Sequence, residues 1–264
     1  MTPGITDWDS QAYRQISDLQ HWLASEALAG VSLHGYERVL HLGCRDGRIT
    51  VAIADQLTAG SVLGIDVSPH MVRAARTLVP PESTRVRFEI GDVLAMPFQD
   101  EFDIVMSFNV LHWVADQERA LRGIAAALHG SGWALIQQVC QGPRPSLEQT
   151  AMRICAQPAW RRYFTGFQPP FRHIEPDTYP QLAAMAGLEV DELSVADLSW
   201  DFGTREAFTR WCRVGFAAWN ARLGSDAAID EFIAEVLDAY TGVSGSPRRF
   251  QFLQMRARLR PTRR

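Results

Sequence analysis

The chain of 264 residues contains no lysine, so all 26 of its basic residues are arginines. A mechanism that forms a Schiff base on a lysine, or that uses a lysine as its base, is therefore excluded. The sequence also has no apolar run near the roughly 20 residues needed to span a bilayer, and its polar start lacks the pattern of a signal peptide. These absences predict a cytoplasmic protein with no membrane partner.

Cysteine is scarce, and strong charge of either sign is missing. Cys44, Cys140, Cys155 and Cys212 show no paired spacing, which argues against a disulfide framework and against a zinc site, so we expect no bound metal. The formal net charge is only −4. Because the total is acidic, the arginine-rich end at 260–264 is interpreted as a solvated tail, and no nucleic-acid partner is expected.

Apolar residues are abundant and periodic. With 47% hydrophobic content the chain can bury one large core. In the first half, strand-like and helix-like patterns alternate, which predicts a parallel sheet with helices on both faces, an α/β fold of the Rossmann-like kind. The expected strands span 37–42, 61–66, 85–91, 102–107 and 133–140. The expected helices span 8–29, 47–58, 69–78 and 116–128.

The second half is unusually rich in aromatic rings. Residues 141–225 carry more of them than a helical layer over a sheet needs, so this part is expected to form a cap. Two segments are expected to return to the sheet, 188–196 and the alternating 249–259. Trp211 and Trp219 lie two helical turns apart, and packing in the cap is favoured over substrate contact for both.

The most informative stretch is 38–50 together with 62–66. A short apolar strand enters a glycine turn at Gly43 and Gly47, a helix follows, and a second strand ends in Asp66, nineteen positions after Gly47. This spacing is typical of nucleoside-binding units, in which the acid accepts from ribose hydroxyls. The turn lacks the third glycine of a dinucleotide site, and no phosphate-loop motif occurs. S-adenosylmethionine, which has no phosphate, fits these features.

Five segments in order complete the pattern: 39–50, 62–76, 86–98, 102–114 and 128–136. Together they resemble the motif series of class I S-adenosylmethionine-dependent methyltransferases, over residues 36–140. Tyr13, Ser17 and Gln20, with the triplet Leu111-His112-Trp113, are similar to the group that contains the trans-aconitate and juvenile hormone acid methyltransferases. The resemblance implies a seven-stranded, mostly parallel sheet with an antiparallel last strand. The expected single domain comprises a helical lid (1–30), a cofactor-binding core (36–140), a substrate cap with one returning strand (141–247) and the last strand (248–260).

The resemblance also assigns roles within the site. The backbone at Gly43, Cys44 and Gly47 is expected beside the methionyl part of the cofactor, and carbonyls near Asn109 beside its ammonium. The ribose and adenine are expected at Asp66, Val67, Met71, Asp92 and Val93. Gln20 and Trp113 are expected to line the junction of cofactor and acceptor, with Tyr13 on the same helix face as Gln20.

Two positions depart from the family pattern. His41 stands where the family usually has an acid, and Arg45 where it usually has a glycine or small residue. A histidine accepts a hydrogen bond near the methionyl ammonium only while neutral, so the sequence predicts that cofactor affinity falls below pH about 6.5. For Arg45 we weigh contact with the methionine carboxylate against exposure to solvent, and favour the latter.

The expected activity is methyl transfer to a small molecule, releasing S-adenosylhomocysteine, with a carboxylate as the preferred acceptor. A carboxylate needs no base but favours an arginine or amide clamp. A hydroxyl, amine or carbon acceptor would use His112 as base, and a catalytically inactive cofactor-binding protein is the further alternative. His112, Gln20 and Trp113 are the candidate catalytic residues, and the protein is expected to be a monomer or homodimer. The candidate clamps are Arg161, Arg162, Arg172, Arg205 and Arg213.

Overall fold

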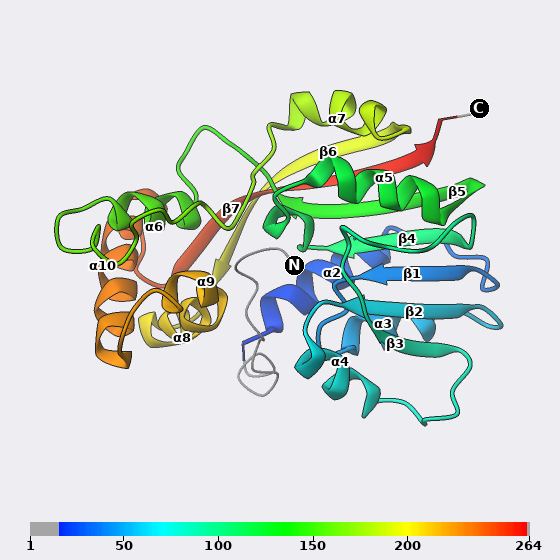
Figure 1. Cartoon of the computed structure of the whole chain (residues 1–264), viewed down its shortest axis with the longest axis horizontal. Helices are drawn as coiled ribbons and strands as arrows, with labels where there is room; N and C mark the ends of the chain where they lie inside the picture. The colour runs from blue at the N-terminus through cyan, green and yellow to red at the C-terminus, as the bar shows by residue number, and fades with distance from the viewer. Residues whose placement is uncertain (1–15, 263–264) are drawn as a thin grey trace.

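A computed structural model describes residues 16–262 of the protein. It shows one seven-stranded sheet at the centre of the fold (Figure 1). The strand order is β3-β2-β1-β4-β5-β7-β6. Only β7 runs antiparallel to its neighbours β5 and β6, which confirms the expected fold and the reversed last strand. The strands are β1 (Arg38–Leu42), β2 (Ser61–Asp66), β3 (Val86–Ile90), β4 (Phe102–Phe108), β5 (Leu128–Val139), β6 (Leu188–Asp201) and β7 (Arg249–Pro261).

The predicted strands agree with the observed ones to within two residues except at two boundaries. β5 begins at Leu128, not at 133, because Leu128 already pairs with Phe102 before a register shift brings Trp133 opposite Ile104. Gly130 and Gly132 interrupt the apolar alternation there, so the pattern concealed the first part of the strand. β6 continues to Asp201, five residues beyond the predicted end at 196.

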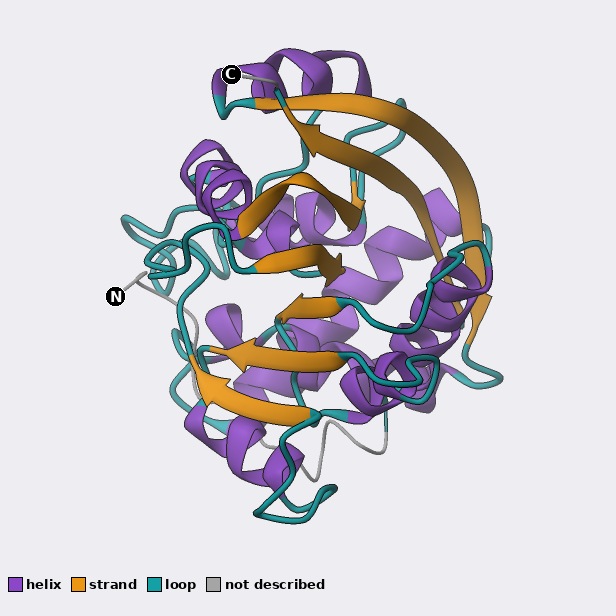
Figure 2. Cartoon of the chain, turned by 90° about the vertical axis from the view of Figure 1, so that its right-hand side faces the viewer, coloured by secondary structure: helices purple, strands orange, loops and turns teal. Residues whose placement is uncertain are grey.

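Helices cover both faces of the sheet (Figure 2). Alternate residues of the strands point to opposite sides, so Val39, Val62 and Ile104 belong to one core cluster, and Leu40 and Leu63 to the other. The first face is covered by α2 (Asp18–Ala29), α3 (Arg48–Ala54) and α4 (Pro69–Arg76). The second is covered by α5 (Gln117–Ala127) and α7 (Tyr179–Met185).

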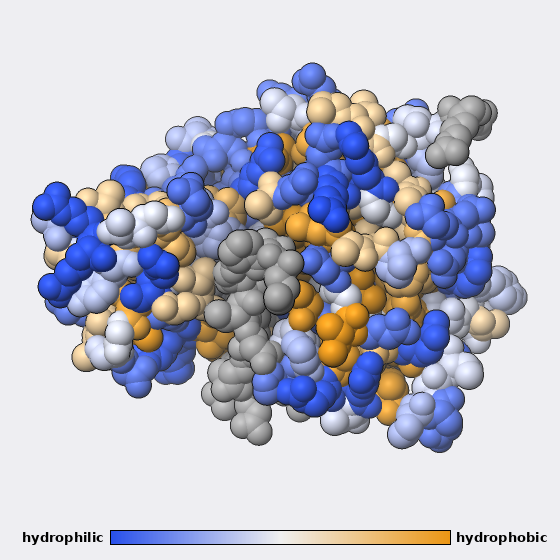
Figure 3. Space-filling view, in the orientation of Figure 1, coloured by the Kyte–Doolittle hydropathy of each residue, from blue (hydrophilic) through white to orange (hydrophobic). Residues whose placement is uncertain are grey.

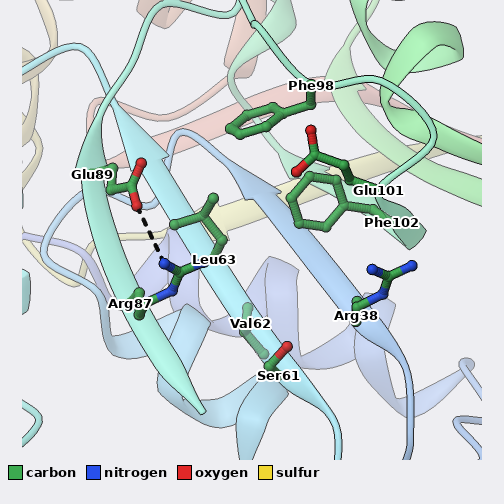
Figure 4. Close-up of a pocket in the computed structure, with 9 residues that line it drawn as sticks. All are labelled: Arg38, Ser61, Val62, Leu63, Arg87, Glu89, Phe98, Glu101 and Phe102. Carbon is green, nitrogen blue, oxygen red and sulfur yellow. Dashed lines mark ion pairs between the residues drawn. The ribbon is translucent and has the colours of Figure 1, made fainter. Parts of the chain in front are cut away.

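No helix formed by residues 16–262 lies in front of part of the second face. Apolar side chains reach the surface over β1 to β3 in the space-filling view (Figure 3). A shallow pocket of about 180 Å³ lies there, with Leu63, Phe98 and Phe102 on its wall and Arg87 paired with Glu89 at its rim (Figure 4). Its lining includes the first residues of β1, β2 and β4, so it opens at the amino-terminal edge of the sheet. Ligands of open α/β sheets bind at the opposite edge.

The cap has an aromatic core of its own. Its helices are α6 (Leu147–Cys155), α8 (Arg205–Gly215), α9 (Ala217–Asn220) and α10 (Asp226–Ser244). Phe208, Phe216, Trp219, Phe232 and Tyr240 are fully buried within it, each contributing about 2–3 kcal/mol by leaving water. The long β6–β7 ribbon runs from the sheet into this cluster, where Phe250 and Phe252 join it (Figure 1).

Gly47 is fixed by both backbone and packing. It caps α3 with φ +86°, and a Cβ there would lie 2.7 Å from the Cβ of Ala75 and 2.8 Å from the Cζ of Phe88. Gly47→Ala is expected to lower the free energy of unfolding by about 2–4 kcal/mol, through left-handed strain and overpacking between α3 and α4. Urea denaturation measures the change. Gly224→Ala, where nothing lies within 4 Å of an added Cβ, is the control, and equal losses in both variants would contradict the argument.

Candidate cofactor and acceptor site

The glycine turn ties the carboxyl ends of β1 and β2 together. The amides of Gly43 and Cys44 both donate to the carbonyl of Ile65, at 2.8 and 2.9 Å. Gly43 has φ +70°, and a Cβ there would lie 2.2 Å from Cγ2 of Val110. The turn therefore requires glycine at this position, and it lies at the sheet edge where ligands of α/β folds bind.

Asp66 organises the loops around this edge. One carboxylate oxygen accepts from the amide of Arg45 at 2.9 Å and the other from the amide of Ser68 at 2.9 Å. Burial raises the pKa of Asp66, and these two amides partly oppose that shift. Each oxygen has a second lone pair for a ligand hydroxyl, so the carboxylate fits the ribose contact expected of it.

The expected adenine contacts gather beside Asp66. The amide of Gly91 donates to the Asp66 carbonyl at 3.0 Å, which holds the end of β3 next to the end of β2. Asp92 and Val93 follow, both half-buried, and Asp92 accepts from the amide of Leu94 at 2.9 Å. Across from them, Met71 is buried and Val67 is 42% exposed. This end of the site offers carboxylates and apolar surface, which suits an adenosine moiety.

The Arg45 side chain points into the site, so the expectation that it faces solvent is wrong. Its Nη2 donates to the carbonyl of Asn109 at 2.7 Å and its Nη1 to the carbonyl of Phe108 at 3.4 Å. These carbonyls end β4, where the methionyl ammonium was expected. Arg45 also has φ +51°, a left-handed conformation that is uncommon for a residue with a side chain.

His41 faces the helical layer. Its Nδ1 lies 2.8 Å from Oγ1 of Thr50 on α3, and its ring packs 5.6 Å from that of Phe108. Burial, assisted by the charge of Arg45, lowers the pKa of His41 to about 3. The lowered pKa argues against the predicted loss of cofactor affinity below pH about 6.5, because with a pKa of about 3 this imidazole is still neutral well below pH 6.5.

Buried polar groups just after β4 and on α2 have no hydrogen-bond partner among the described residues. They are both side-chain atoms of Asn109, Nδ1 of His112 and, on α2, Oε1 of Gln20. His112 belongs to the short 3-10 helix η1 (Leu111–Trp113), and its ring lies 5.1 Å from that of Trp113. Unpartnered buried polar groups are costly, so they mark where a ligand is expected.

Trp113 connects the aromatic cap with these buried polar residues. The Trp113 ring lies 6.5 Å from that of Trp219, edge to face, and Phe171 stacks on Trp219 at 6.3 Å. The amide of Arg172 donates to the His112 carbonyl at 2.7 Å, which fixes this part of the cap to η1. Tyr13 lies outside the described residues. Within them, the helix predicted for 8–29 begins at Asp18.

Glu148 and His173 are two buried groups that the sequence analysis missed. Oε2 of Glu148 lies 4.0 Å from Nε2 of His173, their side chains are only 4% and 2% exposed, and the rings of His173 and His112 are 6.0 Å apart. Burial lowers the pKa of both histidines. An available signal was the position of Glu148 on the apolar face of α6, next to Leu147 and one turn before Ala151.

The candidate arginine clamps all lie at the surface of the cap or in ion pairs there. Arg161 and Arg162 are exposed, and Arg172 donates to the carbonyl of Ala115. Arg205 pairs with Asp238, and Arg213 with Asp226 and Asp230. One of these arginines could therefore bind the acceptor carboxylate only after its side chain moved, whereas the Asn109 amide and the His112 ring are already at the site.

Other kinds of site find little support. All four cysteine thiols are free and buried. Between residues 16 and 262, no His, Cys, Asp and Glu side chains are grouped to hold a metal ion. None of the helices in that range has the length and apolarity to cross a membrane.

Comparison with known proteins connects this geometry to an activity. Residues 40–136 match the model of a family described as "Methyltransferase domain". A trans-aconitate 2-methyltransferase of Mycobacterium sp. (strain KMS) is 30% identical over 188 residues, 70% of each chain. One from Methylobacterium radiotolerans is 28% identical over 243 residues, 90% of this chain and 88% of that protein.

Solved structures share the fold at low identity. The YcgJ protein from Bacillus subtilis superposes with a TM-score of 0.67 at 18% identity, covering 92% of this chain and all (100%) of that one. A Haemonchus contortus phosphoethanolamine N-methyltransferase 2, solved with S-adenosylhomocysteine, has a TM-score of 0.62 at 17% identity. The match covers 97% of this chain and 58% of that one.

Proposed function

The chain belongs to the class I S-adenosylmethionine-dependent methyltransferases, and from this membership we propose that it methylates a carboxylate oxygen of a small molecule. The proposed acceptor site lies between η1 and the aromatic cap. The observation that carries the proposal is the set of buried polar groups at Asn109 and His112, which have no hydrogen-bond partner among residues 16–262 and are not charged. The trans-aconitate 2-methyltransferases among its relatives support the same acceptor class.

The cofactor, when bound, supplies a methyl group on a positively charged sulfur. The proposed task of the protein is to align the acceptor oxygen with that methyl group and to exclude water, which contributes several kcal/mol to catalysis without a proton transfer. Asp66 and Asp92 would hold the nucleoside. Trp113 and the cap rings would cover the junction with the acceptor.

Uncharged hydrogen-bond donors at the site suit a carboxylate as the methyl acceptor. The amide of Asn109 and a ring N–H of His112 each have the capacity to donate to an anionic oxygen. Because burial lowers the pKa of His112 well below its usual value, the imidazole is a weak base. A weak base is of little use for removing a proton from a hydroxyl group, whereas a carboxylate at neutral pH has no proton to remove.

A second candidate function rests on Glu148. A buried carboxyl group 4.0 Å from His173, which in turn neighbours His112, is an arrangement that can stabilise a proton taken up by an imidazole. It would favour a hydroxyl or amine acceptor, with His112 as base. Glu148 would also repel a carboxylate that approached it closely.

Turnover of paired acceptors separates these two functions. With a metabolite carrying only a carboxylate, His112→Ala and Glu148→Gln are expected to retain kcat within about threefold, and His112→Ala is expected to raise KM because its N–H donor to the carboxylate is lost. With a hydroxylated analogue, loss of a general base would lower kcat by about a hundredfold or more. Methyl transfer from labelled S-adenosylmethionine measures both. Equal losses on the two acceptors would contradict the assignment of His112 as a base used only for hydroxyl groups.

The catalytically inactive alternative has its own test. Titration calorimetry with S-adenosylmethionine and S-adenosylhomocysteine, followed by a screen of metabolites as methyl acceptors, separates binding from turnover. We expect tight product binding and turnover of at least one small carboxylic acid. Binding with no acceptor among acids, phenols and amines would favour a non-catalytic protein. Light scattering during the same purification tests the proposed monomer or homodimer.

A further inference from the structure

Arg45 occupies the part of the site that family membership assigns to the cofactor's aminoacyl group. Its guanidinium donates to the carbonyls of Phe108 and Asn109, which lie at the carboxyl end of β4. A primary ammonium needs the same kind of acceptor, because it too is a cation with N–H donors. Although each carbonyl has a second lone pair, two cations held at the same carbonyls repel each other, so the guanidinium and the ammonium compete for this place.

The backbone holds Arg45 in this position. Its amide donates to the Asp66 carboxylate, and its φ of +51° is a left-handed conformation that is strained for a residue with a Cβ. Burial is the main cause of the lowered pKa of His41 and of His112, and the positive charge of Arg45 adds to both shifts. His41, in the place of the family's usual acid, offers no negative charge to attract an ammonium.

We infer that Arg45 is a specificity-determining residue of the cofactor site: it holds the carbonyls of Phe108 and Asn109 as the ammonium would, and must release them before the aminoacyl part of the cofactor binds. The adenosine half does not need this release. Two affinities are compared: that for an adenosine thioether without the amino acid, and that for the complete cofactor. We expect the ratio of the first to the second to be higher in this protein than in a methyltransferase with glycine at this position. This inference concerns cofactor binding and does not depend on which acceptor is methylated.

Calorimetric titration with two ligands tests the inference. S-adenosylhomocysteine carries the aminoacyl group, whereas 5′-methylthioadenosine has the same nucleoside and sulfur without it. Arg45→Gly is expected to raise the affinity for S-adenosylhomocysteine about tenfold or more, the worth of a displaced charged hydrogen bond. The affinity for 5′-methylthioadenosine is expected to change less than about twofold, because that ligand does not reach the carbonyls.

Control variants separate charge from backbone effects. Arg45→Asn removes the guanidinium but tolerates the left-handed conformation, so it should reproduce the gain even if Arg45→Gly were poorly folded. Arg87→Ala removes an exposed arginine at the amino-terminal end of β3 and should change neither affinity. A lower affinity of the Arg45 variants for S-adenosylhomocysteine would overturn the inference, since Arg45 would then hold the methionyl carboxylate. Equal shifts for both ligands would overturn it as well.

Discussion

Asp66→Ala is expected to weaken binding of S-adenosylhomocysteine by at least about a hundredfold. The carboxylate accepts hydrogen bonds from the amides of Arg45 and Ser68, and each of its oxygens has a second lone pair for the ribose. Two hydrogen bonds from ribose hydroxyls to a charged group are worth about 3–6 kcal/mol together, which corresponds to a factor of about 100 or more in affinity. Titration calorimetry at neutral pH measures the loss.

The control for this experiment is a carboxylate at the other end of the sheet. Asp103 on β4 also accepts a backbone amide, that of Arg38 at 2.8 Å, but lies far from the glycine turn in the strand register. Asp103→Ala should leave the affinity unchanged. Asp66→Asn, which keeps the shape of the side chain, should give an intermediate loss. Unaltered binding by Asp66→Ala would remove this residue from the cofactor site.

Buried histidines are expected to make the protein acid-sensitive. His41, His112 and His173 all have pKa values lowered by burial, that of His41 to about 3. In the unfolded chain each titrates near pH 6.5. As the pH falls below 6.5 the unfolded state therefore takes up protons that the native state does not bind, and the free energy of unfolding decreases. Stability is complete above pH about 7 and is lost progressively toward pH 3.

The expected slope is about 1.4 kcal/mol per pH unit for each histidine that stays neutral in the native state. The raised pKa of Asp66 acts in the opposite direction at the acidic end, because the native state then binds the proton more readily. Urea denaturation between pH 7 and pH 4.5 measures the slope. His41→Asn should reduce it by about 1.4 kcal/mol per pH unit, and Gly224→Ala, which removes no histidine, should not. An unchanged slope in His41→Asn would contradict the neutral assignment.

The sheet was predictable because its signal is local. Strand β2 has the predicted limits, since Val62, Leu63 and Ile65 form a short apolar run that ends in Asp66 before a helix with Ser68 as its cap. The start of β5 was not predictable, because two glycines and a register shift break its alternation. Patterns of this kind report burial and turns, but not pairing between distant segments.

The site was predictable only in its framework. The glycine turn, Asp66 and Asp92 follow from spacing along the chain, because the carboxyl ends of parallel strands meet at one edge. The inward direction of Arg45 depends on carbonyls more than sixty residues away, and the pair of Glu148 and His173 joins two separate cap segments. Such contacts are set by the tertiary fold, so single residues in the sequence carry no sign of them.

The ribbon of β6 and β7 bears on how this enzyme's specificity can be re-engineered. Both strands supply the outer edge of the sheet and, further along, a wall of the cap. A chimera that exchanged the cap helices but kept these strands would pack foreign helices against the native side chains of β6 and β7. The two parts of the aromatic cluster would then not be complementary in shape. Grafting a different acceptor preference onto this scaffold therefore requires that the whole segment from α6 to β7 be transplanted as one unit, with the cut sites placed before Leu147 and after Pro261.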